Sequence, residues 1–353
     1  MKTLAFWLTA LVAQAADPWQ VDLWTQGEGG VHTYRIPALV ETKKGTLLAV
    51  ADARYDSNRD LPGRIALVMR TSKDKGKTWS PSRVIRQVDS GGVGDASLLL
   101  DRKTGRVWCF HAYGPPGIGF PTAKPGERTG PSTLQVHAIY SDDDGATWSQ
   151  AVDLTPQIKD PAWVAMFPTS GTHFQTSKGR YLVPMVVRHA DKVVRAHDAY
   201  SDDGGKSWKI GAPIGDRTDE SKVVELADGT VLQNMRNGPR RAIARSTDGG
   251  VTFAAVSHDE ALVDPSCNAG IARAGKLLIF TNAASAKRER LTVKRSSDGG
   301  ANWSAGTVLH AGPAAYSTVI ALRDGTIGVL YERGEKYAAE RITFARFRPD
   351  WIR

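Results

Sequence analysis

Five copies of one eight-residue pattern recur along this chain of 353 residues. Each copy reads S-x-D-x-G-x-[T/S/N]-[W/F], and the copies begin at Ser72, Ser141, Ser201, Ser246 and Ser296. The Asp accepts hydrogen bonds from the amides of its own turn, and the Gly two residues later allows a positive φ. Each copy therefore predicts a hairpin. Spacings of roughly 45 to 70 residues suit four-stranded propeller blades better than short solenoid repeats.

The segments between these hairpins alternate apolar and polar residues over short stretches that end at Gly, Asp or Pro. None of them keeps a helical period over three turns, so the sequence predicts an all-β protein. A second signature, a glycine followed by a short apolar run, begins at Gly45, Gly179, Gly229, Gly275 and Gly325. The two repeated patterns alternate along the chain. This alternation implies antiparallel blades, each with two recurrent hairpins.

The N-terminus has the three parts of a secretory leader. Lys2 supplies the charge, residues 4–12 form the apolar run, and Ala13-Gln14-Ala15 is the cleavage pattern. We expect residues 1–15 to be removed and the protein to be secreted or periplasmic. Residues 16–353 show no break in composition and no apolar run of spanning length, which predicts one domain without membrane insertion. We expect this domain to be a monomer.

The charge of the chain favours an anionic ligand. The formal net charge is +9 and the isoelectric point is near 9.5, but the Lys and Arg residues are scattered. Nucleic-acid binding calls for a basic stripe interleaved with aromatic residues, so a small anionic substrate is favoured. Cys109 and Cys267 are expected to be core thiols, although they could pair. No Cys or His cluster has zinc spacing, and neither a metal nor a cofactor is predicted.

The segment Tyr34-Arg35-Ile36-Pro37 introduces a family resemblance. It is similar to the F/Y-R-I-P signature of the sialidase superfamily, glycoside hydrolase family 33, in which the eight-residue repeats are called Asp boxes. The resemblance runs from Tyr34 to about Glu332. It implies a six-bladed β-propeller of four-stranded antiparallel blades, in which Arg35 binds the carboxylate of the substrate. An Arg that is followed by a β-branched residue and Pro leaves the backbone in a fixed direction, as a bidentate contact requires.

Four further segments resemble the catalytic parts of that family. The stretch 51–63 resembles the part that carries a substrate-binding Arg and the general acid, here Arg54 and Asp60, with Asp56 as the competing acid. The resemblance favours Asp60, because its distance to the following Asp box matches the pattern of that family.

Around the fourth Asp box, the resemblance implies Glu225 as the general base and Arg241 as a second Arg for the carboxylate. Glu225 falls in an apolar strand pattern, where a carboxylate is costly unless it has a partner. Arg236 and Arg240 stay open as alternatives to Arg241. A Glu at a strand end paired with one of these arginines is the structural alternative for Glu225.

The last two segments imply the third Arg and the nucleophile. Residues 287–293 resemble the R-x-x-[LM]-T approach to the fifth box and favour Arg288, with Arg290 as the alternate. Tyr316 matches the nucleophilic tyrosine. Tyr331 has the pattern of a strand residue and Tyr337 that of a loop residue, so neither displaces it.

Two regions are candidates for the remaining contacts with the sugar. Asp95 and the pair Met166-Phe167 are placed on its acyl or glycerol side. Residues 112–132 contain five prolines and no periodicity, which predicts either a rim loop that carries Phe120 over the site or a plain insertion.

These residues together predict an exo-α-sialidase that acts on sialylated glycans. A sialoside bears a carboxylate on its reacting carbon, so a neutral phenol avoids the repulsion that a carboxylate nucleophile would meet. Two displacements at that carbon would give retention. A propeller that binds sialic acid without cleaving it, and a glycosidase of the same fold for a related nonulosonic or uncharged sugar, are the alternatives.

Overall fold

The computed structural model describes residues 17–353, and nearly all of the regular structure in them is β-sheet. The exceptions are one short helix, α1 (Thr155–Ile158), and two 3-10 helices, η1 (Glu28–Gly30) and η2 (Pro349–Trp351). The predicted all-β class is confirmed. Within residues 17–353, no helix has the length and apolarity needed to cross a membrane. The predicted leader lies outside the described residues and stays a prediction.

The strands form five sheets in which nearly all pairs are antiparallel. The first sheet consists of β2 (Thr33–Glu41), β3 (Leu47–Arg54), β4 (Ile65–Ser72) and β5 (Arg83–Arg86). The second consists of β6 (Gly92–Leu100), β7 (Val107–Gly114), β8 (Gln135–Ser141) and β9 (Val152–Asp153), joined in parallel by β11 (Gly171–Thr172). The third consists of β10 (Ala165–Pro168), β12 (Phe174–Gln175), β13 (Tyr181–Arg188), β14 (Val194–Ser201) and β15 (Lys209–Ile210).

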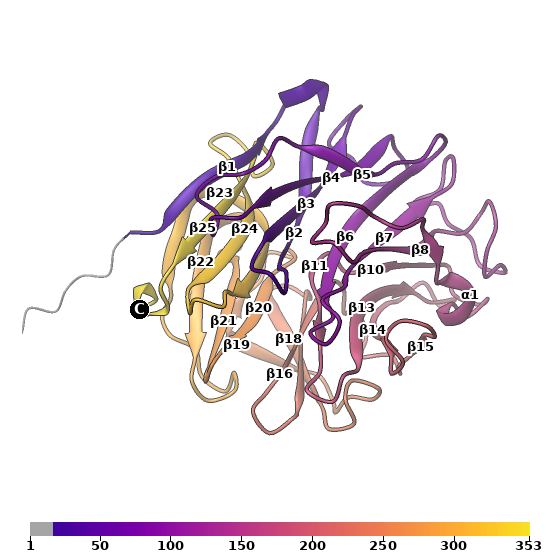
Figure 1. The fold of residues 1–353 in the computed structure, drawn as a ribbon. Coiled ribbons are helices and arrows are strands. Elements are labelled where there is room, and N and C mark those ends of the chain that lie inside the picture. The colour runs from indigo at the N-terminus through magenta and orange to yellow at the C-terminus, as the bar shows by residue number, and fades with distance from the viewer. Residues whose placement is uncertain (1–16) are drawn as a thin grey trace, which may run out of the picture.

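The fourth sheet consists of β16 (Ser221–Glu225), β17 (Val231–Met235), β18 (Arg240–Ser246) and β19 (Ser257–Val263). The fifth has seven strands: β20 (Gly270–Ala274), β21 (Leu277–Ala283), β22 (Glu289–Ser296), β23 (Thr307–Ala321), β24 (Ile327–Arg333), β25 (Arg341–Phe347) and β1 (Trp19–Thr25). The sheets follow one another around the molecule in chain order, as the colours of Figure 1 show.

The five repeated motifs form the predicted hairpins, and each joins the third strand of a sheet to the next strand. In the first, Asp74 accepts hydrogen bonds from the Ser72 hydroxyl (2.8 Å) and from the backbone N–H of Thr78 (2.9 Å). Gly76 has a φ of 86°, and the Trp79 indole donates to its carbonyl (3.1 Å). The motif is a fold element: it fixes the turn and packs an aromatic ring beneath it.

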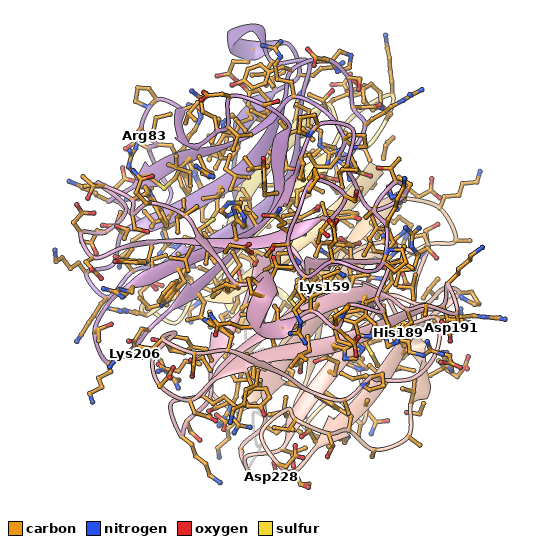
Figure 2. All side chains as sticks on the ribbon, turned by 90° about the vertical axis from the view of Figure 1, so that its right-hand side faces the viewer. Arg83, Lys159, His189, Asp191, Lys206 and Asp228 are labelled. Atoms are coloured by element: carbon orange, nitrogen blue, oxygen red, sulfur yellow. The ribbon has the colours of Figure 1, made fainter. Side chains whose placement is uncertain are left out.

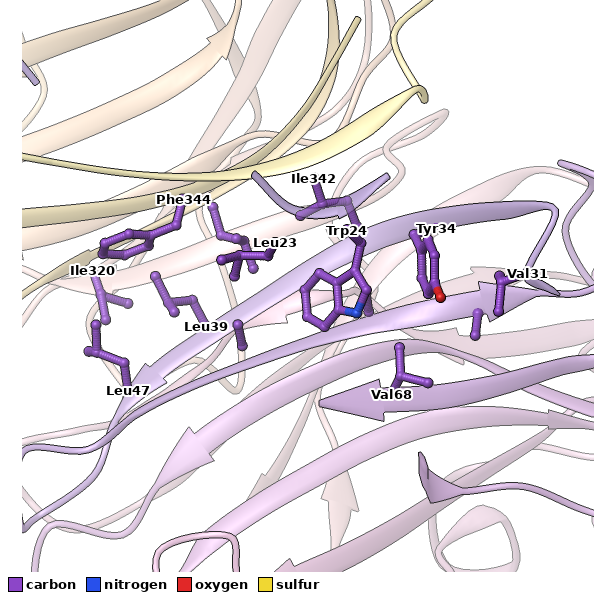
Figure 3. Packing of buried hydrophobic residues seen from close by; sticks show 14 of the residues in the cluster. Leu23, Trp24, Val31, Tyr34, Leu39, Leu47, Val68, Ile320, Ile342 and Phe344 are labelled. Atoms are coloured by element: carbon purple, nitrogen blue, oxygen red, sulfur yellow. The ribbon is translucent and has the colours of Figure 1, made fainter. Parts of the chain in front are cut away.

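The N-terminal strand closes the ring. β1 pairs with β25, so residues from the two ends of the chain share one sheet. A buried cluster joins this sheet to the first one, and within it Trp24 and Tyr34 stack with their ring centres 6.0 Å apart (Figure 3). Phe344 and Leu47 extend the cluster from β25 and β3. Burial of apolar surface on both sides of the junction therefore holds the first and last sheets together.

The Pro-rich segment after β7 forms a rim loop, which is the first of the two structures predicted for residues 112–132. Its backbone is held from the chain that follows β9: the buried Lys159 ammonium donates to the carbonyl of Glu127 (2.6 Å), and Gly126 N–H donates to the carbonyl of Pro161 (2.7 Å) (Figure 2). Phe120 at the tip of the loop packs edge-on against Phe167, with 5.1 Å between the ring centres. The loop is thereby fixed over one side of the cavity described next.

Candidate active site

A cavity of about 560 Å³ opens at the end of the ring opposite the five hairpins. One wall is apolar and comes from two loops and β10; it consists of Leu61, Pro62, Phe120, Pro121, Leu134 and Phe167. The other wall is polar and consists of Arg59, Asp60, Asp95, Asp219, Glu220, Arg236 and Tyr316. Of the predicted pair on β10, Phe167 lines the cavity, whereas Met166 is fully buried in the core beneath it. Such a mixed surface is typical of a small-molecule site.

Tyr316 lies at the centre of the polar wall, on β23. Its hydroxyl donates to Oε2 of Glu220 (2.6 Å), and the guanidinium of Arg236 donates to the Tyr316 oxygen (3.1 Å) and to the same Glu220 oxygen (2.7 Å). Burial and the negative charge of Glu220 raise the pKa of Tyr316 well above its ordinary value. The phenol is therefore neutral at rest and bonded to a carboxylate that can take its proton.

Two more arginines approach the ring of Tyr316. The Arg35 guanidinium lies 5.1 Å from the ring centre and that of Arg288 lies 5.7 Å from it. Arg288, which precedes β22, also donates to the carbonyl of Ser266 (2.9 Å). With Arg236, three cations from three different sheets surround one phenol. A cluster of this kind suits an anionic group with several acceptor oxygens.

Glu332 holds Arg35 in place and was missed by the sequence analysis. Its carboxylate is fully buried and accepts from the Arg35 guanidinium (2.7 and 3.2 Å), from Ile36 N–H (2.8 Å) and from Tyr316 N–H (3.1 Å). The signal was its place in the apolar strand 327–332, because an acidic residue there requires a partner. Ile36 has a φ of 62°, strained for a β-branched residue, so the Glu332 contact stabilises a bulge that directs Arg35.

The predicted general acid lies on the other side of the cavity. Asp60 is 75% exposed, on the loop after β3, and its Oδ1 is 2.7 Å from NH1 of Arg54. Arg54 is 1% exposed and also contacts Asp52 (3.2 Å). The competing acid, Asp56, forms an exposed ion pair with Arg64 (3.0 Å) and is absent from the cavity wall. The structure thus places Asp60, and not Asp56, where it can meet a ligand.

Asp95 completes this side of the cavity. It has a φ of 58° at a bulge of β6, and its N–H donates to Oδ1 of Asp52 (3.1 Å). Burial raises the pKa of Asp52 to about 7, although Arg54 acts in the opposite direction. Burial and the negative charge of Asp52 raise the pKa of Asp95 well above its ordinary value. The predicted residues Arg54, Asp60 and Asp95 are therefore brought together around Asp52.

Glu225 does not lie beside Tyr316, so its predicted place as the base is wrong. Its carboxylate accepts from the N–H (2.7 Å) and the hydroxyl (2.8 Å) of Ser177, and it lines a separate hollow with Lys178. Glu225 ends β16, whereas Glu220 precedes it, and five residues of strand separate the two by roughly 16 Å. Glu220 occupies the position that the prediction gave to Glu225.

Arg241 is likewise displaced from the cavity. Its side chain is fully buried, and its guanidinium pairs with Asp264 (3.0 Å) and donates to Asn234 Oδ1 (2.7 Å) and to the carbonyl of Cys267 (2.8 Å). These contacts occupy the guanidinium inside the fold. Arg236, one of the alternatives that the sequence left open, faces the cavity in its place.

The two cysteines can be compared with their prediction. Cys109 and Cys267 are free and buried, as expected for core thiols. Residues 17–353 contain no group of three or more His, Cys, Asp or Glu side chains placed to hold a metal ion. The cavity holds a neutral phenol with a carboxylate partner, three arginines and an exposed carboxylate across the space.

Comparison with known proteins relates this arrangement to a family. The model of the BNR repeat-like domain matches residues 45–329. A sialidase of Micromonospora viridifaciens is 38% identical over an alignment of 357 residues, which covers 94% of this chain and 54% of that protein. A sialidase of Bacteroides fragilis is 35% identical, with 87% of this chain and 61% of that protein covered. The chain therefore spans between half and two thirds of the length of these two relatives.

Solved structures agree with the sequence relatives. The structure of Hadza microbial sialidase Hz136 superposes with a TM-score of 0.87 at 31% identity, covering 95% of this chain and 69% of that one. An intramolecular trans-sialidase from Ruminococcus gnavus, at 19% identity and a TM-score of 0.80, shares the fold. From the matched domain, the identity to Hz136 and the shared propeller fold, it follows that the chain belongs to the sialidase family and carries its BNR repeat-like domain.

Proposed function

We propose that this protein is an exo-α-sialidase that removes terminal sialic acid from glycans, with retention, through a covalent tyrosyl intermediate. The observation that carries the proposal is the short bond from the Tyr316 hydroxyl to Glu220 (2.6 Å) among three arginines. A phenol paired with a base is a nucleophile, and the cations around it select a substrate that is anionic at the reacting carbon. Sialosides have this property.

The arginines are assigned to the substrate carboxylate. Arg35, Arg236 and Arg288 come from separate sheets, so a carboxylate between them would be held in one orientation. Their positive charge offsets the cost of removing the carboxylate from water. Glu332 is assigned the support of Arg35, since both carboxylate oxygens of Glu332 are already engaged.

In the first displacement, Glu220 takes the phenolic proton while the Tyr316 oxygen attacks the anomeric carbon. The bond from that carbon to the leaving oxygen breaks, and Asp60 gives the leaving oxygen a proton. In the second displacement, Asp60 removes a proton from water, the water oxygen attacks the same carbon, and the Tyr316 oxygen leaves and regains its proton from Glu220. Two inversions restore the starting configuration.

We also propose that the ring has six blades. β23 pairs with β22 as far as Pro313 and with β24 from Ala314 onward, so the seven-stranded sheet divides naturally there. The first half of β23 completes a blade with β20, β21 and β22, and the second half completes another with β24, β25 and β1. Each of these halves then has four strands, as the first and fourth sheets have.

The test is hydrolysis of a fluorogenic α-sialoside by the purified protein, followed by proton NMR of the sugar released first. We expect release from the sialoside, but not from a panel of other aryl glycosides, and the α-anomer as the first product. The β-anomer first would contradict the retaining mechanism. Binding of sialic acid in a calorimeter without any product would favour a non-catalytic binding protein, and release from another sugar would favour the related-glycosidase alternative.

Arg236 and Arg241 provide a matched pair of predictions. Arg236→Met should lower kcat/KM for the sialoside by about 10²-fold, since it removes a charged donor at the reaction centre. Arg241→Met should instead lower the free energy of unfolding by about 3 kcal/mol or more, because it leaves Asp264 buried without its partner. Steady-state kinetics and thermal unfolding of both variants separate the two effects.

The same two variants also show which result would contradict the assignment of Arg236. A folded Arg241→Met protein with a large loss of kcat/KM, beside an active Arg236→Met protein, would return the carboxylate-binding role to Arg241. Equal thermal stability of Arg236→Met and the wild type would show that any loss at Arg236 comes from the site itself.

A further inference from the structure

We propose that Asp52 is a positioning residue for the proton donor: through Arg54 it sets the place of Asp60 against the leaving group. The inference rests on the proposed function, because it assumes that Asp60 protonates a leaving oxygen. It adds to that function a residue that touches no substrate and lies outside the cavity wall.

Asp52 and Arg54 lie two residues apart on β3 and therefore face the same side of the sheet. Both are 1% exposed, and Oδ2 of Asp52 accepts from NH2 of Arg54 (3.2 Å). From there Arg54 reaches the loop after β3, where NH1 contacts Oδ1 of Asp60 (2.7 Å) and the carbonyl of Asn58 (2.8 Å). One buried guanidinium thus links a fixed carboxylate inside the sheet to an exposed one on the loop.

Asp60 depends on this link because its loop supplies little else to fix it. The loop, residues 55–64, has no regular structure, and the Asp60 side chain is 75% exposed. A general acid has to stand within hydrogen-bond reach of the oxygen it protonates. An exposed carboxylate explores several rotamers unless a partner restrains it, so the orientation of Arg54 decides where Asp60 stands.

The second oxygen of Asp52 fixes the opposite wall. Oδ1 accepts from Asp95 N–H (3.1 Å) at the bulge of β6, where φ is 58°. The fit is close: a Cβ added to Gly94 would lie 3.1 Å from Oδ2 of Asp52. Asp52 therefore joins the first and second sheets at the cavity. It fixes the loop that carries Asp60 and the bulge at Asp95 relative to each other.

Glu332 has the same arrangement on the nucleophile side. There, too, a buried carboxylate on the second strand of a blade accepts one backbone N–H at the bulge of the next blade, that of Ile36, and orients one Arg, Arg35. Two buried carboxylates thus fix the two sides of the cavity: Glu332 on the side of Tyr316, and Asp52 on the side of Asp60.

The test uses two substrates that differ in their need for an acid. A phenol leaving group departs readily without a proton, whereas a sugar hydroxyl does not. Asp52→Asn, which keeps the shape of the side chain, should lower kcat/KM for sialyllactose by about 10²-fold or more. It should lower kcat/KM for an aryl sialoside by no more than about tenfold, because protonation contributes less there. Asp60→Asn in the same assays gives the full size of the acid effect.

The matched control is Asp264→Asn. Asp264 is also a fully buried carboxylate that accepts from one Arg, Arg241 (3.0 Å), and from a backbone N–H, that of Cys267 (2.9 Å), but it lies outside the cavity wall. Its substitution should leave the ratio between the two substrates unchanged, whatever it does to stability. A purely structural role for Asp52 would likewise lower both activities by the same factor.

Three outcomes are decisive. Equal losses on the two substrates, or none, in folded Asp52→Asn would overturn the inference. If Asp52→Asn does not fold, Arg54→Lys takes its place: a lysine keeps the cation but cannot contact Asp52, Asp60 and Asn58 together, and it should show the same selective loss on sialyllactose. A wild-type protein that cleaves neither substrate would overturn the proposed function itself, and this inference with it.

Discussion

Tyr316→Phe should lower kcat for an α-sialoside by about 10³-fold or more, one of the two largest effects expected in this protein. The change removes the attacking oxygen and little else. The ring is only 8% exposed and packs against Ile36 and Ala315, and phenylalanine keeps that packing. Loss of the hydroxyl bond to Glu220 should cost about 1 kcal/mol of stability. Steady-state kinetics and thermal unfolding of the purified variant measure both quantities.

Tyr331→Phe is the control for this experiment. Tyr331 is a fully buried tyrosine on β24, and its hydroxyl donates to Gln20 Oε1 (2.6 Å), away from the cavity wall. It should lose comparable stability and keep its kcat. If Tyr316→Phe retained wild-type turnover while folded, a covalent tyrosyl intermediate would be ruled out and the nucleophile would have to be sought elsewhere.

The fold was largely predictable because its signals are local. Each Asp box contains its own turn residues, so spacing and strand alternation alone indicate repeated antiparallel sheets. The closing strand was not predictable in this way. β1 pairs with β25 across more than 300 residues, and nothing in residues 19–25 names that partner. Non-local pairing of this kind is decided by tertiary packing, here by the cluster around Trp24.

The predicted site residues that the structure places at the cavity follow one geometric rule. Arg35 and Asp95 lie early in the first strands of their sheets, and Arg54 ends the second strand of its sheet. Antiparallel pairing brings the start of a first strand and the end of the second to the same edge. Arg236 follows the end of β17 and Glu220 precedes β16, so both obey the rule.

Of the two displaced predictions, Glu225 breaks that rule, whereas Arg241 lies at the same edge of its sheet as the end of β17 but points away from the cavity. Glu225 was preferred because it follows two valines, a pattern that suggests a buried carboxylate. It lies instead at the far end of β16, where Ser177 satisfies its charge. Arg241 was implied by the resemblance, but it is the second residue of β18 and points into the fold toward Asp264. Spacing along the chain predicts the strand to which a residue belongs. Which end of that strand lies at the cavity depends on the direction in which the strand runs in its blade.

Substitutions at Glu220 and Glu225 test which of the two glutamates is the base. Glu220→Gln should lower kcat/KM by about 10² to 10⁴-fold, since an amide cannot take the phenolic proton although it keeps the shape of the side chain. Glu225→Gln is the matched control and should leave kcat/KM unchanged, because its carboxylate is engaged by Ser177 outside the cavity.

The choice of substrate sharpens the Glu220 result. Glu220 acts on the nucleophile and not on the leaving oxygen, so Glu220→Gln should reduce the cleavage of an aryl sialoside and of sialyllactose by similar factors. Substitutions on the acid side, at Asp60 or Asp52, should spare the aryl substrate. A loss in Glu225→Gln with full activity in Glu220→Gln would contradict the assignment of the base. A loss in Glu220→Gln confined to sialyllactose would place Glu220 with the acid and not with Tyr316.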